Sequence, residues 1–97
     1  MIIVWSPTAR AHLRHARAFI AEDNPRAAAM TAKRILTAVE RLKDFPASGR
    51  PGLLPHTREL VVPGTPFILP YRVKGERIEI LGVTHGARRR PLTFSSL

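Results

Sequence analysis

Two stretches in the first half of the chain repeat apolar residues every three or four positions, and this spacing predicts two amphipathic helices. The first begins after Ser6-Pro7 and the second after Asn24-Pro25, since Ser and Asn cap helix starts and Pro fits the first turn. The first apolar stripe is Ala9, Leu13, Ala16, Phe19 and Ile20. The second is Ala28, Ala32, Ile35, Val39 and Leu42. A connection of about three residues predicts that the two helices form an antiparallel hairpin.

The pattern changes to β-prone runs in the second half of the chain. Three runs, at about 57–62, 67–73 and 77–85, are separated by short Pro-Gly and Lys-Gly turns, so neighbouring strands are expected to pair antiparallel. Another β-prone run, Ile2–Trp5, precedes the helices, and the Pro- and Gly-rich segment 46–55 is expected to be a loop. The order is β-α-α-β-β-β. It predicts an α+β fold with the helical hairpin packed on one face of a small antiparallel sheet.

Strand alternation predicts that both faces of this sheet are apolar. One face is expected to carry Phe67, Leu69, Tyr71, Val73, Ile78 and Ile80. The other is expected to carry Ile68, Pro70, Arg72, Leu81, Val83 and His85. Because the helices can cover one face only, we expect another protein chain to cover the second. The alternative is that the C-terminal segment 91–94 folds back over it.

Length and composition limit the number of domains and exclude several classes of protein. A chain of 97 residues is expected to form a single domain, residues 1–97. The absence of cysteine excludes disulfides and thiolate metal sites. No cofactor or metal ion is expected. No stretch approaches the ~20 apolar residues of a membrane span and no secretion signal is evident, so we expect a cytoplasmic protein without a membrane partner.

The net charge is the property of the composition that says most about possible partners. Sixteen Lys and Arg residues against seven Asp and Glu give a formal net charge of +9. Such a field attracts nucleic acid, ribosomes or an acidic protein partner.

Candidate chemistry gathers at the end of the last predicted strand. His85 is followed by Arg88, Arg89 and Arg90, while Arg58 lies on a neighbouring strand. A basic cluster with one imidazole can bind RNA phosphate and move a proton during cleavage.

Four further side chains carry groups that could serve catalysis or metal binding. Tyr71 and Glu79 are the candidates for a second acid or base, but Tyr71 alternates onto the core face and Glu79 is expected to pair with an arginine. His12 and His15 lack a third metal ligand nearby, which favours a role on the helix surface.

Several segments, taken in order, resemble the RelE/ParE toxin superfamily. They are 45–50 (Phe-Pro-Ala-Ser-Gly-Arg), 58–60 (Arg-Glu-Leu), 70–73 (Pro-Tyr-Arg-Val), 78–81 (Ile-Glu-Ile-Leu), and Val83 with 85–88 (His-Gly-Ala-Arg). The resemblance implies a toxin of a bacterial type II toxin–antitoxin module. Its partner would be a small ParD-like antitoxin whose acidic C-terminal segment wraps the toxin.

The superfamily divides by activity, and the resemblance favours one branch. RelE-like members cleave mRNA on the ribosome with several Lys and Arg residues and often a C-terminal Tyr. This chain has Ile68 where such members carry a middle-strand arginine, and it has no Tyr after the last strand. The strings 70–73 and 85–88 are closer to ParE-like members, which poison DNA gyrase and are not enzymes.

The sequence therefore predicts a ParE-like toxin that inhibits DNA gyrase and uses Arg88, Arg89 and Arg90 to contact it. The helical hairpin and the outer sheet face are expected to bind the antitoxin, and the predicted antitoxin-binding residues are Ile68, Arg72, Leu81, Val83 and Arg58. One alternative is a ribosome-dependent mRNA endonuclease with His85, Arg88 and Arg58 as catalytic residues. The other is an inactive module that only binds an antitoxin.

Overall fold

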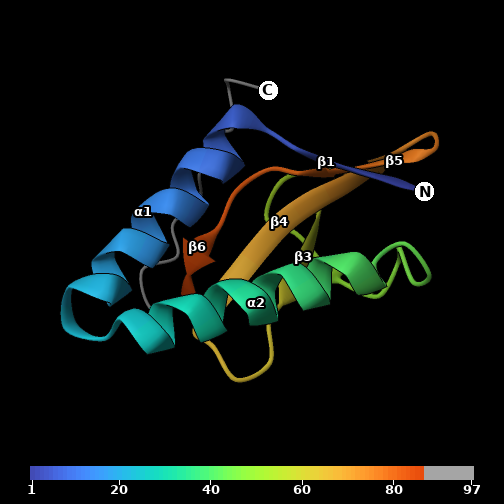
Figure 1. The fold of residues 1–97 in the computed structure, drawn as a ribbon. Helices are drawn as coiled ribbons and strands as arrows, with labels where there is room; N and C mark the ends of the chain where they lie inside the picture. Colours follow the sequence, from blue (N-terminus) through green and yellow to red (C-terminus); the bar gives the residue numbers. More distant parts are fainter. Residues whose placement is uncertain (87–97) are drawn as a thin grey trace.

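The structure, a computed structural model, describes residues 1–86 (Figure 1). The elements in chain order are β1 (Ile2–Trp5), α1 (Pro7–Asp23), α2 (Pro25–Arg41), β2 (Arg50–Pro51), β3 (Arg58–Val61), β4 (Phe67–Lys74), β5 (Arg77–Ile80) and β6 (Thr84–His85). This order agrees with the predicted arrangement of one strand, two helices and a C-terminal run of strands. The prediction that segment 46–55 is only a loop is wrong, because the short strand β2 lies within it and pairs with β3.

The sheet has the strand order β1-β5-β4-β3-β2, and β6 pairs with β4 beyond the end of β5. The pairs β3–β4 and β4–β5 are antiparallel, as their short turns predicted. β1 adds a parallel edge strand beside β5, which makes the sheet mixed. Parallel pairing is open to β1 because a long connection, rather than a hairpin turn, separates it from β5.

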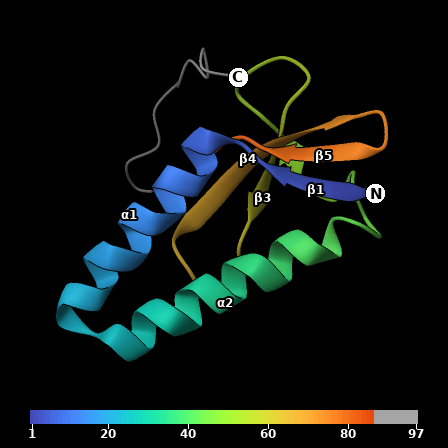
Figure 2. The ribbon, with the colours of Figure 1, turned by 45° about the horizontal axis from the view of Figure 1, so that its top comes forward.

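The helical hairpin turns at one residue. Asn24 ends α1 by donating its backbone N–H to the Ile20 carbonyl, and its side-chain oxygen accepts the Ala27 N–H at the start of α2. Pro25 occupies the first turn of α2, where its missing N–H costs no helical hydrogen bond. This junction reverses the chain direction, and the two helices open from it as a V, as Figure 2 shows.

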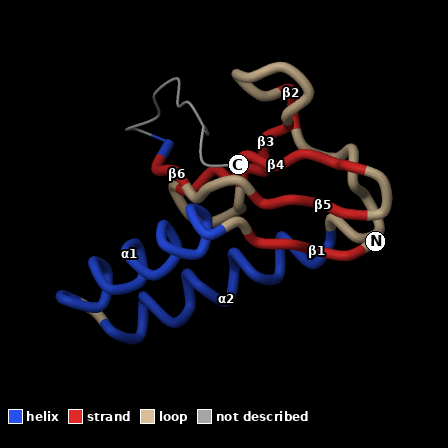
Figure 3. The backbone as a smooth tube through the Cα atoms, turned by 90° about the horizontal axis from the view of Figure 1, so that it is seen from above, coloured by secondary structure: helices blue, strands red, loops and turns tan. Residues whose placement is uncertain are grey.

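The hairpin packs on one face of the sheet, and the core lies between the two layers (Figure 3). Ile35 and Val39 of α2 and Leu42, which directly follows the helix, share the core with Leu69 and Tyr71 of β4. The predicted α+β fold class is confirmed.

The last predicted strand is interrupted. β5 ends at Ile80, residues 81–83 are not in a strand, and β6 begins at Thr84. The break resets the alternation of side chains, so Val83 joins the core beside Phe67 instead of facing outward. The sequence prediction that Val83 lies on the outer face is therefore wrong.

The outer face is also less open than predicted. Ile68 and Leu81 are only 8% and 2% exposed, and Pro70 between them is buried. Gly86 lies against Ile68, because a Cβ built on Gly86 would come within 3.5 Å of Ile68 Cδ1. The expectation of an exposed apolar stripe at Ile68 and Leu81 is wrong for this structure.

Within residues 1–86, neither helix is long and apolar enough to cross a membrane.

Candidate functional site

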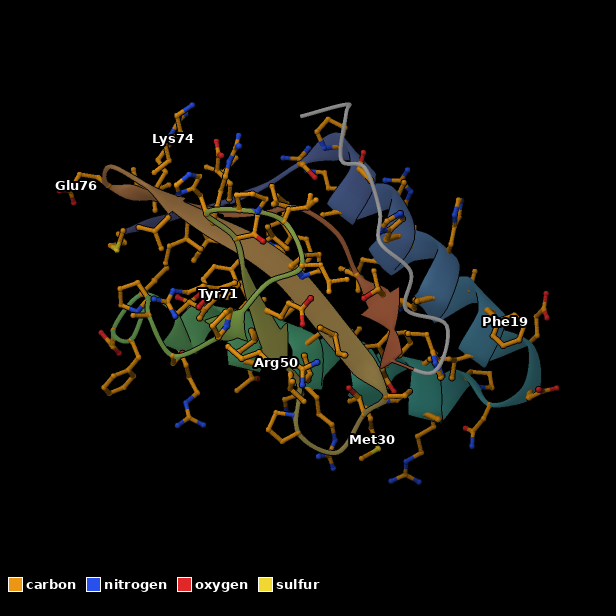
Figure 4. The ribbon with its side chains drawn as sticks, turned by 180° about the vertical axis from the view of Figure 1, so that it is seen from behind. Phe19, Met30, Arg50, Tyr71, Lys74 and Glu76 are labelled. Atoms are coloured by element: carbon orange, nitrogen blue, oxygen red, sulfur yellow. The ribbon has the colours of Figure 1, made fainter. Side chains whose placement is uncertain are left out.

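Tyr71 lies on β4, within the Pro-Tyr-Arg-Val string 70–73, and it is fully buried; Figure 4 labels it. Its hydroxyl donates to the Pro46 carbonyl at 2.8 Å and accepts the Gly49 N–H at 2.9 Å. The side chain has no exposed surface. Tyr71 therefore fastens the loop after α2 to the sheet, and it is not available as a catalytic acid or base at the surface.

Arg58 fastens the same loop from the neighbouring strand. It pairs with Tyr71 across the β3–β4 ladder, and its Nη1 donates to the carbonyls of Gly49 at 2.9 Å and Ala47 at 3.2 Å. Gly49 has no room for a side chain, since a Cβ there would lie 2.6 Å from the Tyr71 hydroxyl. The segments 45–50, 58–60 and 70–73 thus act together to hold the loop after α2 against the sheet.

Two of the seven carboxylates form ion pairs with arginines on neighbouring strands. Arg50 Nε lies 3.1 Å from Glu59 Oε1, and Glu59 is 5% exposed. Arg72 Nε donates to Glu79 Oε1 at 2.5 Å, as was expected for Glu79. This hydrogen bond lowers the pKa of Glu79 below its ordinary value, and the nearby positive charges of Arg72, Arg77 and Lys74 act in the same direction, against partial burial.

His85 and Arg58, two of the proposed ribonuclease residues, are not brought together. His85 pairs with Phe67 on one side of β4, while Arg58 pairs with Tyr71 on the other side. Four residues along a strand and two strand spacings place their Cα atoms roughly 16 Å apart. The His85 ring instead meets the ring of Phe67 edge to face, with centroids 5.8 Å apart. Arg88, Arg89 and Arg90 lie outside the described residues.

His12 has a structural contact that the sequence did not indicate. Its Nδ1 accepts the Val83 N–H at 3.1 Å, so the half-buried ring ties α1 to the interrupted last strand. Burial lowers the pKa of His12 below its ordinary value of 6.5, and the charge of His15 lowers it further. Among residues 1–86, no group of three His, Asp or Glu side chains is placed to hold a metal ion.

A surface that combines exposed apolar groups with cationic ones runs along α2. Two adjoining hollows of about 410 and 330 Å³ share Ala38, Arg41 and Pro63. We call their combined surface the α2 groove: Met30, Lys33, Arg34, Thr37, Ala38, Arg41, Phe45, Ser48, Leu60, Val61 and Pro63. Phe45 is 62% exposed, and Met30 and Val61 are about half exposed.

The sequence prediction included the helical hairpin as a binding surface but named no residue of this groove, because it assigned the free apolar residues to the outer sheet face. The signal was present in Met30 and Phe45, which lie outside the buried stripe of the second helix and remain exposed. Apolar residues beside unpaired basic ones are typical of a surface that binds an amphipathic acidic segment.

Three comparisons place these observations among known proteins. Residues 3–90 match the family model described as "ParE toxin of type II toxin-antitoxin system, parDE". The protein "Putative toxin Y4kP" of Sinorhizobium fredii is 45% identical over 89 residues, which are 92% of this chain and 92% of that protein. Toxin RelE2 of Caulobacter vibrioides is 33% identical over 86 residues, 89% of this chain and 96% of the relative.

A solved structure supports the same likeness in three dimensions. The structure titled "Chromosomal ParDE TA system from P. aeruginosa" contains a chain that superposes with a TM-score of 0.78 at 30% identity. The match covers 88% of this chain and 95% of the other.

Proposed function

The chain belongs to the ParE toxin family of type II toxin–antitoxin systems, and from this premise we propose that it acts in the cytoplasm by inhibiting DNA gyrase. The toxin would bind gyrase and stall the state in which DNA is cleaved. A cognate antitoxin with an acidic segment would neutralise it.

One observation carries the choice of gyrase over RNA cleavage: His85 and Arg58 lie on opposite sides of β4, roughly 16 Å apart. A general acid or base must lie within hydrogen-bond reach of the proton it moves. Arg58 is also bound to two loop carbonyls, and Tyr71 is sealed in the core. A toxin that acts by binding does not require these groups to converge.

Two purified assays test the proposal side by side. The toxin is added to DNA gyrase with relaxed plasmid, and separately to ribosomes translating a defined mRNA. We expect supercoiling to fall with toxin concentration while the mRNA stays intact. Unchanged supercoiling together with ribosome-dependent mRNA cleavage would overturn the proposal.

Ribosome-dependent mRNA cleavage remains the second candidate function, because a relative named RelE2 is 33% identical over most of the chain. If His85→Ala abolishes transcript cleavage and gyrase is unaffected, this candidate is correct. An inactive antitoxin-binding module is the third reading. Normal growth of bacteria after induced expression would support it.

The antitoxin surface is proposed to include the α2 groove. Of the residues first predicted for it, Ile68, Leu81 and Val83 are buried. Arg72 is partly engaged with Glu79, and Arg58 holds the 47–49 loop. The α2 groove, by contrast, exposes apolar side chains to a partner. Its lysine and two arginines have no ion-pair partner within the part of the chain described, so they are free to bind carboxylates. Apolar anchors with carboxylate–arginine pairs at the rim would hold an acidic amphipathic segment.

Matched pairs of variants test this surface. Phe45→Asp and Arg41→Glu change the α2 groove, while Phe19→Asp and Arg26→Glu make the same changes on exposed residues outside it. Figure 4 shows Phe19 near the hairpin end of α1. Affinity for the antitoxin encoded beside the toxin gene is expected to fall about tenfold or more in the first pair only. Equal losses in both pairs would contradict the assignment.

A further inference from the structure

A second cavity lies away from the α2 groove, where the 50–57 segment passes the end of β4. Its volume is about 340 Å³, and its lining residues are Pro51, His56, Thr57, Arg58 and Val73. It is large enough for a small anionic group. Two of the five lining side chains, His56 and Arg58, carry nitrogen donors.

Arg58 is held in place with donors left over. Its Nη1 is used by the Ala47 and Gly49 carbonyls. Its Nε and Nη2 have no hydrogen-bond partner in the described part of the chain. A guanidinium fixed by two carbonyls loses little freedom when it binds a further group, and its planar fork matches the oxygens of a phosphate.

His56 is the residue of the cavity with an unusual backbone. Its φ of 62° lies in the left-handed region, which is uncommon for a residue other than glycine. The loop around it is closed by a Gly52 N–H bond to the Thr57 carbonyl at 2.8 Å and by a Thr57 hydroxyl bond to the Leu54 carbonyl at 2.6 Å. The His56 ring is exposed and makes no hydrogen bond or ion pair with another described residue.

No carboxylate lines the cavity. The acidic residues on the strands beside it are Glu59 and Glu79, and both are directed to the opposite face of the sheet by strand alternation. Each of them is already paired with an arginine on that face. Within the described chain, the cavity is therefore a cationic hollow without an internal counter-charge.

We propose that this cavity binds a phosphate group, with Arg58 Nε and Nη2 and the imidazole of His56 as donors. The same chemistry is offered by free phosphate, by a terminal phosphate of a nucleotide and by the phosphodiester backbone of a nucleic acid. A net charge of +9 raises the local concentration of any of them. The inference is independent of gyrase as the target, since it concerns one anion on the isolated protein.

The test is a titration of the isotope-labelled full chain, followed through the backbone amide signals of residues 56–58. The probes are inorganic phosphate, dimethyl phosphate and a dinucleotide with and without a 5′-phosphate, with sodium chloride matched for ionic strength. His56→Gly removes the ring and suits the left-handed backbone, so the variant is expected to fold. Arg58→Gln is the second variant. His15→Gln and Arg26→Gln are the matched controls on exposed helix positions.

We expect saturable shifts with at least one phosphate probe, weakened about fivefold or more in His56→Gly and in Arg58→Gln and unchanged in the controls. Binding of dimethyl phosphate would assign the cavity to a nucleic-acid backbone. Binding restricted to inorganic phosphate and the 5′-phosphorylated dinucleotide would assign it to a phosphate monoester. The proposal is wrong if no probe saturates, or if His56→Gly binds as tightly as the unaltered protein.

Discussion

Replacing Tyr71 by Phe removes one oxygen atom from a fully buried position and breaks two hydrogen bonds. The Pro46 carbonyl loses a donor at 2.8 Å, and the Gly49 N–H loses an acceptor at 2.9 Å. Each bond contributes about 1 kcal/mol net, and the Gly49 N–H is buried, so leaving it unpaired adds to the loss. We expect the free energy of unfolding to fall by roughly 2–3 kcal/mol.

Such a loss is large for a domain of this size, whose total stability is about 5–10 kcal/mol. It corresponds to a fall in Tm of roughly 8–20 °C. The measurement is guanidinium unfolding followed by circular dichroism, with Ser48→Ala as control. Ser48 lies in the same loop, is exposed, and its hydroxyl makes no hydrogen bond with the described chain. The control is expected to change stability by less than about 0.5 kcal/mol. A Tyr71→Phe protein as stable as the control would refute the reasoning that the hydroxyl fastens the loop.

Three further predictions concern stability. Gly49→Ala places a methyl carbon 2.6 Å from the same hydroxyl and is expected to cost about 2 kcal/mol in guanidinium unfolding, and no loss would mean that the loop moves freely. Because Arg72 lowers the pKa of Glu79 in the folded state, this pair stabilises the fold above pH about 4.5, and the gain disappears as pH falls through the folded-state pKa. Glu79→Gln should flatten that part of the pH–stability curve by under about 1 kcal/mol, since the pair is partly exposed, and a curve unchanged from wild type would contradict the assignment. The pKa of His12 is also lowered in the folded state, so the unfolded chain binds its proton first and stability falls as pH drops below 6.5. His12→Asn retains an acceptor for the Val83 N–H and does not titrate, so it should lose this slope, and an identical slope in both proteins would contradict the lowered pKa of His12.

The helices and the order of strands were predictable because their signals are local. Ser6 and Asn24 cap helices with side-chain oxygens that accept the Ala9 and Ala27 N–H groups, as their positions before prolines indicated. The short turns fixed the antiparallel neighbours of β4. Local sequence could not show that β1 joins β5 in parallel, because a pairing across some 75 residues leaves no pattern near either strand.

The candidate site was less predictable, because burial and pairing depend on three-dimensional neighbours. The sequence did not indicate that Arg58, through its Nη1, also holds the 47–49 loop, because that contact depends on its position opposite Tyr71. Val83 was assigned to the outer face by counting along one strand, and the break at 81–83 made that count wrong. The phosphate cavity escaped notice because the left-handed backbone of His56 is not visible in residue types alone.

The central claim is that this toxin poisons gyrase by binding, and one measurement tests it most directly. Gyrase, supercoiled plasmid and ATP are incubated with the purified toxin, and the reaction is stopped with detergent and protease so that trapped double-strand breaks appear as linear DNA. The account predicts that linear DNA accumulates with toxin concentration and that prior addition of the antitoxin prevents it. A plasmid that stays circular at toxin concentrations that arrest growth in cells would contradict the account.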